Sequence, residues 1–178
     1  MHAHPCACIM GKAGAGAKAG GVAGVLTGLV SGASSYIYLL LYREEFLAFL
    51  RRLLESLPPQ AATLLTPESM YQTALYSSVI GALLGSIVTG LIFGALAGWR
   101  WESLPGRGLV KGLVAGLIAF AAITILSFAS SALMPISAPS GMLEPARLWN
   151  ASISLLTYLL WGAVTAALYM RWARPGAS

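Results

Sequence analysis

Residues 2–8 read HAHPCAC and bring together four side chains that can bind a metal, namely His2, His4, Cys6 and Cys8. Imidazole nitrogen and thiolate sulfur are common zinc ligands, so this segment is a metal candidate. Its uniform spacing of two differs from the usual zinc patterns, in which ligand pairs are separated and held by a small fold. A translation start at Met10 would remove the segment altogether. We therefore expect no metal and no other cofactor.

The rest of the sequence offers little for catalysis. It contains no aspartate, and both histidines lie in the segment above, so no serine has a His–Asp partner to activate it. The serines and threonines of the apolar stretches are expected to form hydrogen bonds between helices, at about 0.6 kcal/mol each. They are Ser34, Ser35, Ser77, Ser78, Thr89, Thr124, Ser130 and Ser131. We predict no catalytic residue and a protein that is not an enzyme.

Composition indicates the elements that carry these residues. The chain has 178 residues, of which 57% are hydrophobic and only 10% charged, whereas a soluble domain is about one quarter charged. Helices of about 20 apolar residues cross the roughly 30 Å of a bilayer core. Four such stretches occur, at residues 20–42, 74–98, 108–130 and 149–170. The sequence therefore predicts an all-α, polytopic membrane protein with four transmembrane helices.

These four spans form one predicted domain, residues 20–172. It lies between a flexible N-terminal tail, residues 1–19, and a C-terminal tail, residues 173–178. The N-terminal tail includes GKAGAGAKAGG, which reads as a linker. The fourth span contains only one glycine, Gly162, and is otherwise bulky, so we expect it at the periphery of the bundle.

Charge gives an expected partner and orientation. The net charge is +5, and the basic residues flank the spans, which indicates contact with a membrane surface rather than with nucleic acid. Lysine and arginine are enriched in cytoplasmic loops. The side shared by both termini carries Lys12, Lys18, Arg100, Arg107, Lys111, Arg171 and Arg174, and the other side carries Arg43, Arg51, Arg52 and Arg147. We expect both termini in the cytoplasm and the protein in a prokaryotic plasma membrane.

Glycines recur at helical spacing along three of the spans. Small residues on one face let two helix backbones approach closely in lipid, where no hydrophobic force drives association. The predicted helix-packing residues are Gly20, Gly24, Gly28, Gly32, Gly81, Gly85, Gly90, Gly94, Gly98, Gly108, Gly112 and Gly116. The interval of five between Gly85 and Gly90 shifts the stripe around its helix. These faces pack the helices of one chain, or form an oligomer face, or line a pore or lipid groove.

Two segments of the chain resemble each other. GGVAGVL (residues 20–26) is similar to GLVAGLI (residues 112–118), and the ends of spans two and four share an aromatic-Gly-Ala step, an Arg-Trp pair and a Pro-Gly exit. This pattern predicts two tandem two-helix hairpins in the same orientation, as in transporters built from parallel repeats.

The first loop, predicted to lie outside the cell, contains an amphipathic segment. In residues 43–57, leucines and a phenylalanine share one face, while Glu44, Arg51 and Glu55 lie opposite. We expect a helix here that continues the first span or lies flat on the membrane. Thr66 and Pro67 follow as the expected N-cap and first residue of span two. The proline-rich residues 134–145 are expected to form an irregular loop.

Two functions remain open at this point. The first is a structural or accessory membrane protein that packs through its glycine faces within itself, in a homo-oligomer or in a larger membrane complex. The second is a small transporter or channel for a neutral or hydrophobic solute, built on the duplicated hairpins. In both, the lipid bilayer is a partner, and a further partner is the chain itself or another membrane protein.

Overall fold

A computed structural model describes residues 5–56, 66–133 and 140–173, with side chains for residues 11–56, 66–130 and 148–173. The helices are α1 (Pro5–Leu41), α2 (Arg43–Glu55), α4 (Pro67–Trp99), α5 (Leu109–Leu133) and α6 (Ser140–Trp172), with a 3-10 turn at Trp101–Ser103. Four helical segments are long and apolar enough to cross a membrane: Gly11–Leu41, Pro67–Trp99, Leu109–Ser130 and Leu148–Trp172. The protein is therefore an all-helical integral membrane protein.

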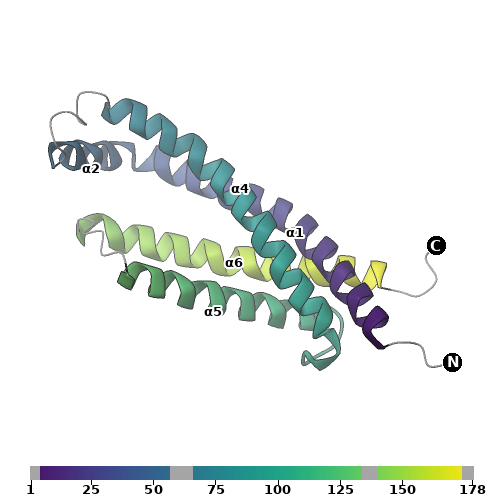
Figure 1. The fold of residues 1–178 in the computed structure, drawn as a ribbon. Helices are drawn as coiled ribbons and strands as arrows, with labels where there is room; N and C mark the ends of the chain where they lie inside the picture. The colour runs from purple at the N-terminus through teal and green to yellow at the C-terminus, as the bar shows by residue number, and fades with distance from the viewer. Residues whose placement is uncertain (1–4, 57–65, 134–139, 174–178) are drawn as a thin grey trace.

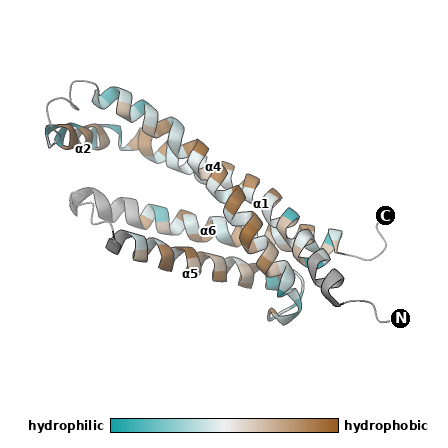
Figure 2. Ribbon diagram, in the orientation of Figure 1, coloured by the Kyte–Doolittle hydropathy of each residue, from teal (hydrophilic) through white to brown (hydrophobic). Residues whose placement is uncertain are grey.

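Polar residues mark the ends of this bundle. Hydrophobic residues dominate the long helices, whereas hydrophilic ones gather on α2, at the start of α4 and in the connection from α4 to α5 (Figure 2). The start of α1 and the end of α6 lie at one end of the molecule, which we call the terminal end, and α2 lies at the other, which we call the α2 end (Figure 1).

The long helices pack as two pairs. Helix α1 runs along α4, and α5 runs along α6. The two pairs meet mainly where α1 contacts α6, whereas α4 contacts α5 and α6 only sparsely. The helices therefore follow the order α4–α1–α6–α5 around the bundle, with close packing on three sides. Helix α6 contacts both α1 and α5 and contributes buried residues such as Trp161 and Ala166, so the peripheral position expected for span four is wrong.

The first helix begins earlier than the sequence indicated. Residues 11–19, expected in a flexible tail, belong to α1, and Gly16 and Ala19 are buried. The reason is that Gly16 extends the glycine spacing of four by one step towards the N-terminus. A Cβ added at Gly16 would lie 2.8 Å from the Cα of Gly98, so the glycine-rich segment is a close-packed helix and not a linker.

Helix α4 begins at the predicted cap. The Thr66 hydroxyl accepts a hydrogen bond from the Ser69 amide at 3.1 Å, and the Thr66 amide donates to the Ser69 hydroxyl at 3.2 Å. This reciprocal capping, with Pro67 in the first turn, confirms the expected N-terminus. The helix is therefore longer than the apolar stretch at residues 74–98.

The last helix also extends past its apolar stretch. Helix α6 starts at Ser140, so residues 140–145 are helical, where an irregular loop was expected. Pro145 lies within this helix. Residues 134–139 of the expected loop lie outside the described residues.

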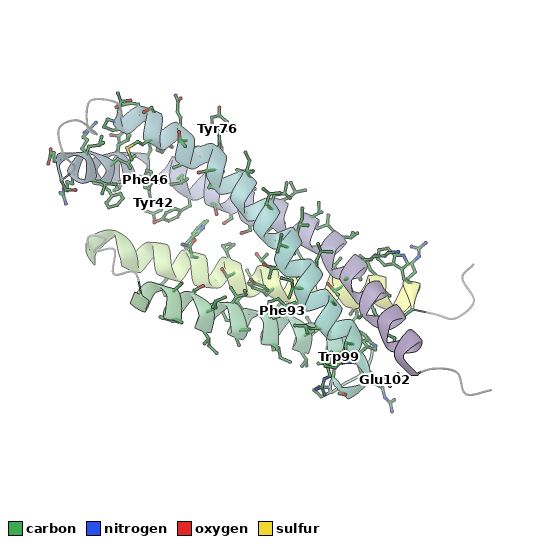
Figure 3. All side chains as sticks on the ribbon, in the orientation of Figure 1. Tyr42, Phe46, Tyr76, Phe93, Trp99 and Glu102 are labelled. Carbon is green, nitrogen blue, oxygen red and sulfur yellow. The ribbon has the colours of Figure 1, made fainter. Side chains whose placement is uncertain are left out.

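Helix α2 folds back against the start of α4. Leu47 and Leu50 of α2 are buried together with Tyr71 of α4, and the Tyr71 hydroxyl donates to the Leu39 carbonyl at 3.1 Å. Phe46 packs on the same cluster (Figure 3). The face of α2 that carries Arg51 and Arg52 is exposed. The apolar face of α2 is thus covered by the protein's own helices.

Candidate functional site

A cavity of about 210 Å³ lies among all four long helices. Its most frequent lining residues are serines and threonines, two from each helix: Thr27 and Ser31, Ser86 and Thr89, Thr124 and Ser127, Ser154 and Thr157. In every pair the two residues are three or four positions apart, which places both on one helix face. Apolar and aromatic residues complete the wall, among them Phe93, which lies where α4 crosses the second helix pair (Figure 3).

The cavity lies at the depth of the membrane core. Thr27 is near the middle of the first candidate span, Gly11–Leu41. Along α4, at 1.5 Å per residue, Phe93 lies roughly 9 Å from Trp99 and Ser86 lies roughly 20 Å from it. A hydroxyl at this depth finds no bulk water, so its hydrogen bonds must come from the protein, from trapped water or from a bound molecule.

Most of these serine and threonine hydroxyls have no partner among the described residues. Thr27 donates to the Ala23 carbonyl at 3.0 Å, and Thr157 donates to the Ile153 carbonyl at 2.6 Å. The other six form no hydrogen bond with any part of the chain that the structure describes: Ser31, Ser86, Thr89, Thr124, Ser127 and Ser154. Serine and threonine in membrane helices commonly satisfy themselves on the preceding turn. Six that do not, around one cavity, provide a surface ready to bind a polar molecule.

Trp161 closes the cavity towards the terminal end. Its indole nitrogen donates to the Gly20 carbonyl at 3.0 Å, and its side chain is only 4% exposed. It packs in one apolar cluster with Ala23, Ala119 and Phe93. The hydrogen bond joins α6 to α1 within the candidate spans.

A second tryptophan joins the same two helices nearer the α2 end. The Trp149 indole nitrogen donates to the Ser34 hydroxyl at 3.1 Å. The Trp149 ring also contacts Tyr38, with ring centroids 6.1 Å apart. Helices α1 and α6 are therefore connected on both sides of the cavity. Of the serines and threonines singled out from sequence, Ser34 is the one that forms a hydrogen bond between two helices within the described residues.

The cavity carries no formal charge. None of its lining residues is an aspartate, glutamate, lysine, arginine or histidine. A bound ion would therefore have to leave water without a compensating charge, at a cost of many kcal/mol. The hydroxyls can donate and accept hydrogen bonds, which suits a neutral polar group.

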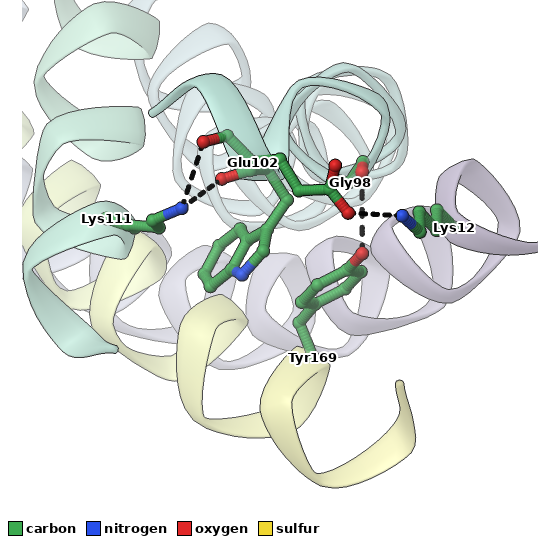
Figure 4. A network of polar contacts seen from close by, with 6 residues as sticks. Lys12, Gly98, Glu102, Lys111 and Tyr169 are labelled. Atoms are coloured by element: carbon green, nitrogen blue, oxygen red, sulfur yellow. Dashed lines mark hydrogen bonds and ion pairs between the residues drawn. The ribbon is translucent and has the colours of Figure 1, made fainter. Parts of the chain in front are cut away.

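Charged residues lie at the two ends of the bundle, and those at the terminal end form a network of contacts (Figure 4). Lys12 of α1 forms an ion pair with Glu102, and the Lys111 ammonium donates to the Trp101 carbonyl at 2.6 Å. Lys12 holds the pKa of the exposed Glu102 carboxyl below its usual value, through a hydrogen bond first and its charge second. Tyr169 of α6 donates to the Gly98 carbonyl at 3.4 Å. These contacts attach the α4–α5 connection to α1 and α6.

The structure brings most of the predicted helix-packing glycines against a neighbouring helix. On α1, Gly20 lies against Gly90 and Gly94, and Gly24 lies against Ser86. In the second pair, Gly112 lies against Gly162. The remaining glycines with such neighbours are Gly28 and Gly32 against Leu83 and Val79, Gly98 against Lys12 and Gly16, and Gly116 against Tyr158.

Three predicted packing glycines differ from this pattern. A Cβ added at Gly81 or Gly85 would meet nothing within 4 Å among the described residues. The interval of five before Gly90 turns these two away from α1. Gly108 has a positive φ of 52° just before α5, so its role is the left-handed turn that starts this helix.

The sequence also left some of the site unassigned. Thr89 and Thr124 were singled out, but Thr27, Ser31, Ser86, Ser127, Ser154 and Thr157 were not. The signal that would have found them is a hydroxyl pair at a spacing of three or four in the middle of each span. Gly16 and Gly162 were likewise not included among the packing glycines.

The proposed metal ligands His2 and His4, and the side chains of Cys6 and Cys8, lie outside the described residues. Among the side chains that the structure does describe, no group of three or more His, Cys, Asp or Glu residues could hold a metal ion.

No family model matches the chain, and no curated protein or solved structure is detectably similar to it. Its function therefore has to be argued from the site itself.

Proposed function

We propose that this protein is a small, non-catalytic membrane transporter that binds a neutral, hydrogen-bonding solute in the hydroxyl-lined cavity. One observation carries the proposal: six serine and threonine hydroxyls within the candidate spans surround about 210 Å³ of space without a partner in the described chain. Unpaired polar groups are costly in a low-dielectric environment. A solute that accepts and donates hydrogen bonds removes that cost when it binds.

The packing of the glycines supports a self-contained bundle. Glycine faces on α1, α4, α5 and α6 lie against partners inside the chain, so they need no second protein to explain them. Each helix pair is close-packed internally, and the pairs join mainly along α1 and α6. Two such units with the cavity between them suit a transporter in which one unit rocks against the other.

The proposal is tested by solute flux into liposomes that contain only the purified protein. We expect uptake of small polyols or amides above that of empty liposomes, and no uptake of monovalent ions. The double substitution Thr89→Val and Thr124→Val removes two cavity hydroxyls at nearly constant volume and should reduce the flux by about tenfold, on the order of one hydrogen bond per substitution.

A matched control is Ser77→Ala, because Ser77 is exposed on α4 and donates to the Ala74 carbonyl of its own helix at 3.3 Å. This variant should transport like the native protein. Equal flux in empty and protein-containing liposomes, for every neutral solute tried, would overturn the proposal.

A second candidate is an accessory role in a larger membrane complex, and one observation favours it. The α4 face with Gly81 and Gly85 has nothing within 4 Å among the described residues, and the nearby Leu84 is exposed. A helix of another protein could approach this face closely. Stoichiometric co-purification with another membrane protein in mild detergent, lost in Gly85→Leu, would support this role. Purification of the chain alone, unchanged by Gly85→Leu, would oppose it.

A further inference from the structure

We infer that the solute reaches the cavity from the lipid, between α4 and α5, and that it is an uncharged amphiphile with a hydroxyl-bearing head and a hydrocarbon chain. This inference rests on the proposed function, because it names the substrate class and the route for the same cavity. It follows from the open side of the bundle, the closed terminal end of the cavity and the uncharged wall that combines hydroxyls with apolar groups.

The open side lies between α4 and α5. Each of these helices packs closely on its own partner, and α1 packs on α6, but α4 and α5 contact each other only sparsely. Both nevertheless line the cavity, α4 through Ser86, Thr89 and Phe93 and α5 through Phe120 and other residues. Since the outer faces of both helices are apolar and belong to candidate spans, this side faces hydrocarbon.

The route along the bundle axis towards the terminal end is obstructed. Towards the terminal end stands Trp161, fixed by its hydrogen bond to Gly20 and packed on Ala23 and Ala119. Beyond it, Gly16 and Gly98 bring α1 and α4 into backbone contact. Nearer the α2 end, the Trp149 contacts with Ser34 and Tyr38 close the side between α1 and α6. The side between α4 and α5 has no comparable contact among the described residues.

The wall carries hydroxyls together with apolar and aromatic groups. Four of the six unpartnered hydroxyls belong to α4 and α5, which flank the open side and also contribute Phe93, Phe120 and Ile123, and the other two are Ser31 and Ser154 on the helices opposite. The cavity volume of about 210 Å³ corresponds to about seven waters at 30 Å³ each. That space accommodates a small polyol or glycerol-ester head but not a lipid chain, which would extend through the open side into the bilayer.

The absence of charge selects the head group. No acidic or basic residue lines the cavity, so a phosphate, carboxylate or ammonium head would lose its hydration without gaining a counter-charge. A head with free hydroxyls exchanges hydrogen bonds with the six unpartnered side chains instead. Monoacylglycerol is the simplest probe with such a head and a single chain.

The test uses Trp161 as a fluorescent reporter in the cavity. A variant with Trp99, Trp101, Trp149 and Trp172 replaced by Phe retains Trp161 alone, and it is reconstituted in phosphatidylcholine vesicles. Brominated monoacylglycerol and brominated phosphatidylcholine, with bromine at the same chain position, are then compared as quenchers. If this variant does not fold, the difference in quenching between the native chain and Trp161→Phe gives the same readout.

We expect brominated monoacylglycerol to quench Trp161 half-maximally at about one tenth of the mole fraction that brominated phosphatidylcholine requires. Adding Thr89→Val and Thr124→Val should raise the mole fraction of brominated monoacylglycerol needed for half-maximal quenching by about tenfold, which removes most of the preference. Ser77→Ala should leave the preference unchanged. Equal quenching by the two lipids, or a preference that survives the double substitution, would overturn the inference.

The failure of this inference is distinguishable from that of the proposed function. Flux of a water-soluble polyol without any lipid preference at Trp161 would keep the transporter and reject entry from the bilayer. A chain that shows neither flux nor preferential quenching would reject both. Strong self-association that excludes both brominated lipids from Trp161 would show that a second copy of the chain covers the open side, and would also reject the inference.

Discussion

Among the described residues, the backbones of α1 and α4 approach most closely at Gly20, so a substitution there should change the stability most. A Cβ added at Gly20 would lie 2.7 Å from the Cα of Gly94, whereas non-bonded carbons prefer about 3.5–4.0 Å. The Gly20→Ala substitution therefore requires α1 and α4 to separate by about 1 Å. The obstructing atom belongs to a helix backbone, so no side-chain rotation relieves the overlap. We expect a loss of about 1–3 kcal/mol, the usual cost of overpacking a core.

The same helix pair provides a graded series for this measurement. The corresponding distance from an added Cβ to the nearest partner Cα is 2.9 Å at Gly28, to Leu83, and 3.3 Å at Gly32, to Val79. At Gly81 nothing lies within 4 Å. Alanine should therefore destabilise most at position 20, less at 28, little at 32 and not at all at 81.

Thermal unfolding in detergent or nanodiscs, followed by circular dichroism, measures this order. At about 2–4 °C per kcal/mol for a chain of this length, Gly20→Ala should unfold several degrees below the native protein. Gly81→Ala should unfold at or above the native temperature, because alanine is a better helix former than glycine. Equal unfolding temperatures for these two variants would refute the claim that glycine contacts hold α1 against α4.

Three further predictions concern other parts of the chain. Thr165 is 3% exposed and its hydroxyl has no partner among the described residues. Thr165→Val removes this unsatisfied group at constant shape, so it should leave the unfolding temperature unchanged or raise it. A clear decrease in the unfolding temperature would show that the hydroxyl is paired. Lys12 lowers the pKa of Glu102 in the folded protein, so this ion pair contributes its full stabilisation above the ordinary glutamate pKa of about 4.3. The contribution decreases as the pH falls through the lower folded pKa. In Glu102→Gln, the unfolding temperature measured against pH should no longer show this decrease. Leu50 is 4% exposed in the α2 cluster, so Leu50→Ala should lower the free energy of unfolding by about 2–5 kcal/mol. Leu53 is 37% exposed, so Leu53→Ala should lower it little. Hydrogen exchange of α2 should therefore become faster in Leu50→Ala alone.

The membrane spans were predictable because each rests on a local property. Hydropathy over about 20 residues identifies a membrane-spanning helix without any knowledge of its neighbours. The cap at Thr66 is equally local, since it depends on Pro67 and Ser69 within the same turn. Residues 11–19 were misread because glycine and alanine indicate a linker in water. Beside Gly94 and Gly98 the same residues pack as a helix.

The cavity was not predictable in the same way, because it depends on how four helices are rotated about their axes. Thr27 and Ser31 were not singled out on α1, and neither was Ser154 on α6. Nothing in a single span reveals that its hydroxyls face those of the other three. That rotation is set by the contacts between helices, as where Gly112 meets Gly162 or where Trp161 reaches the Gly20 carbonyl. A prediction of the site would need the pairing of helices first.

The order of residues along each packing ridge explains why the cavity lies where it does. Residues spaced by four form the ridges through which helices pack. On α4 this ridge runs through three glycines, at 98, 94 and 90, and then reaches Ser86. On α5 it runs through two glycines, at 112 and 116, and then reaches Phe120 and Thr124. Helices α1 and α4 stay in close contact beyond Ser86, because Gly28 and Gly32 of α1 lie against Leu83 and Val79. The cavity therefore lies between the two helix pairs, beside the ends of these ridges at Ser86, Phe120 and Thr124, and two of these three residues contribute hydroxyls to its wall.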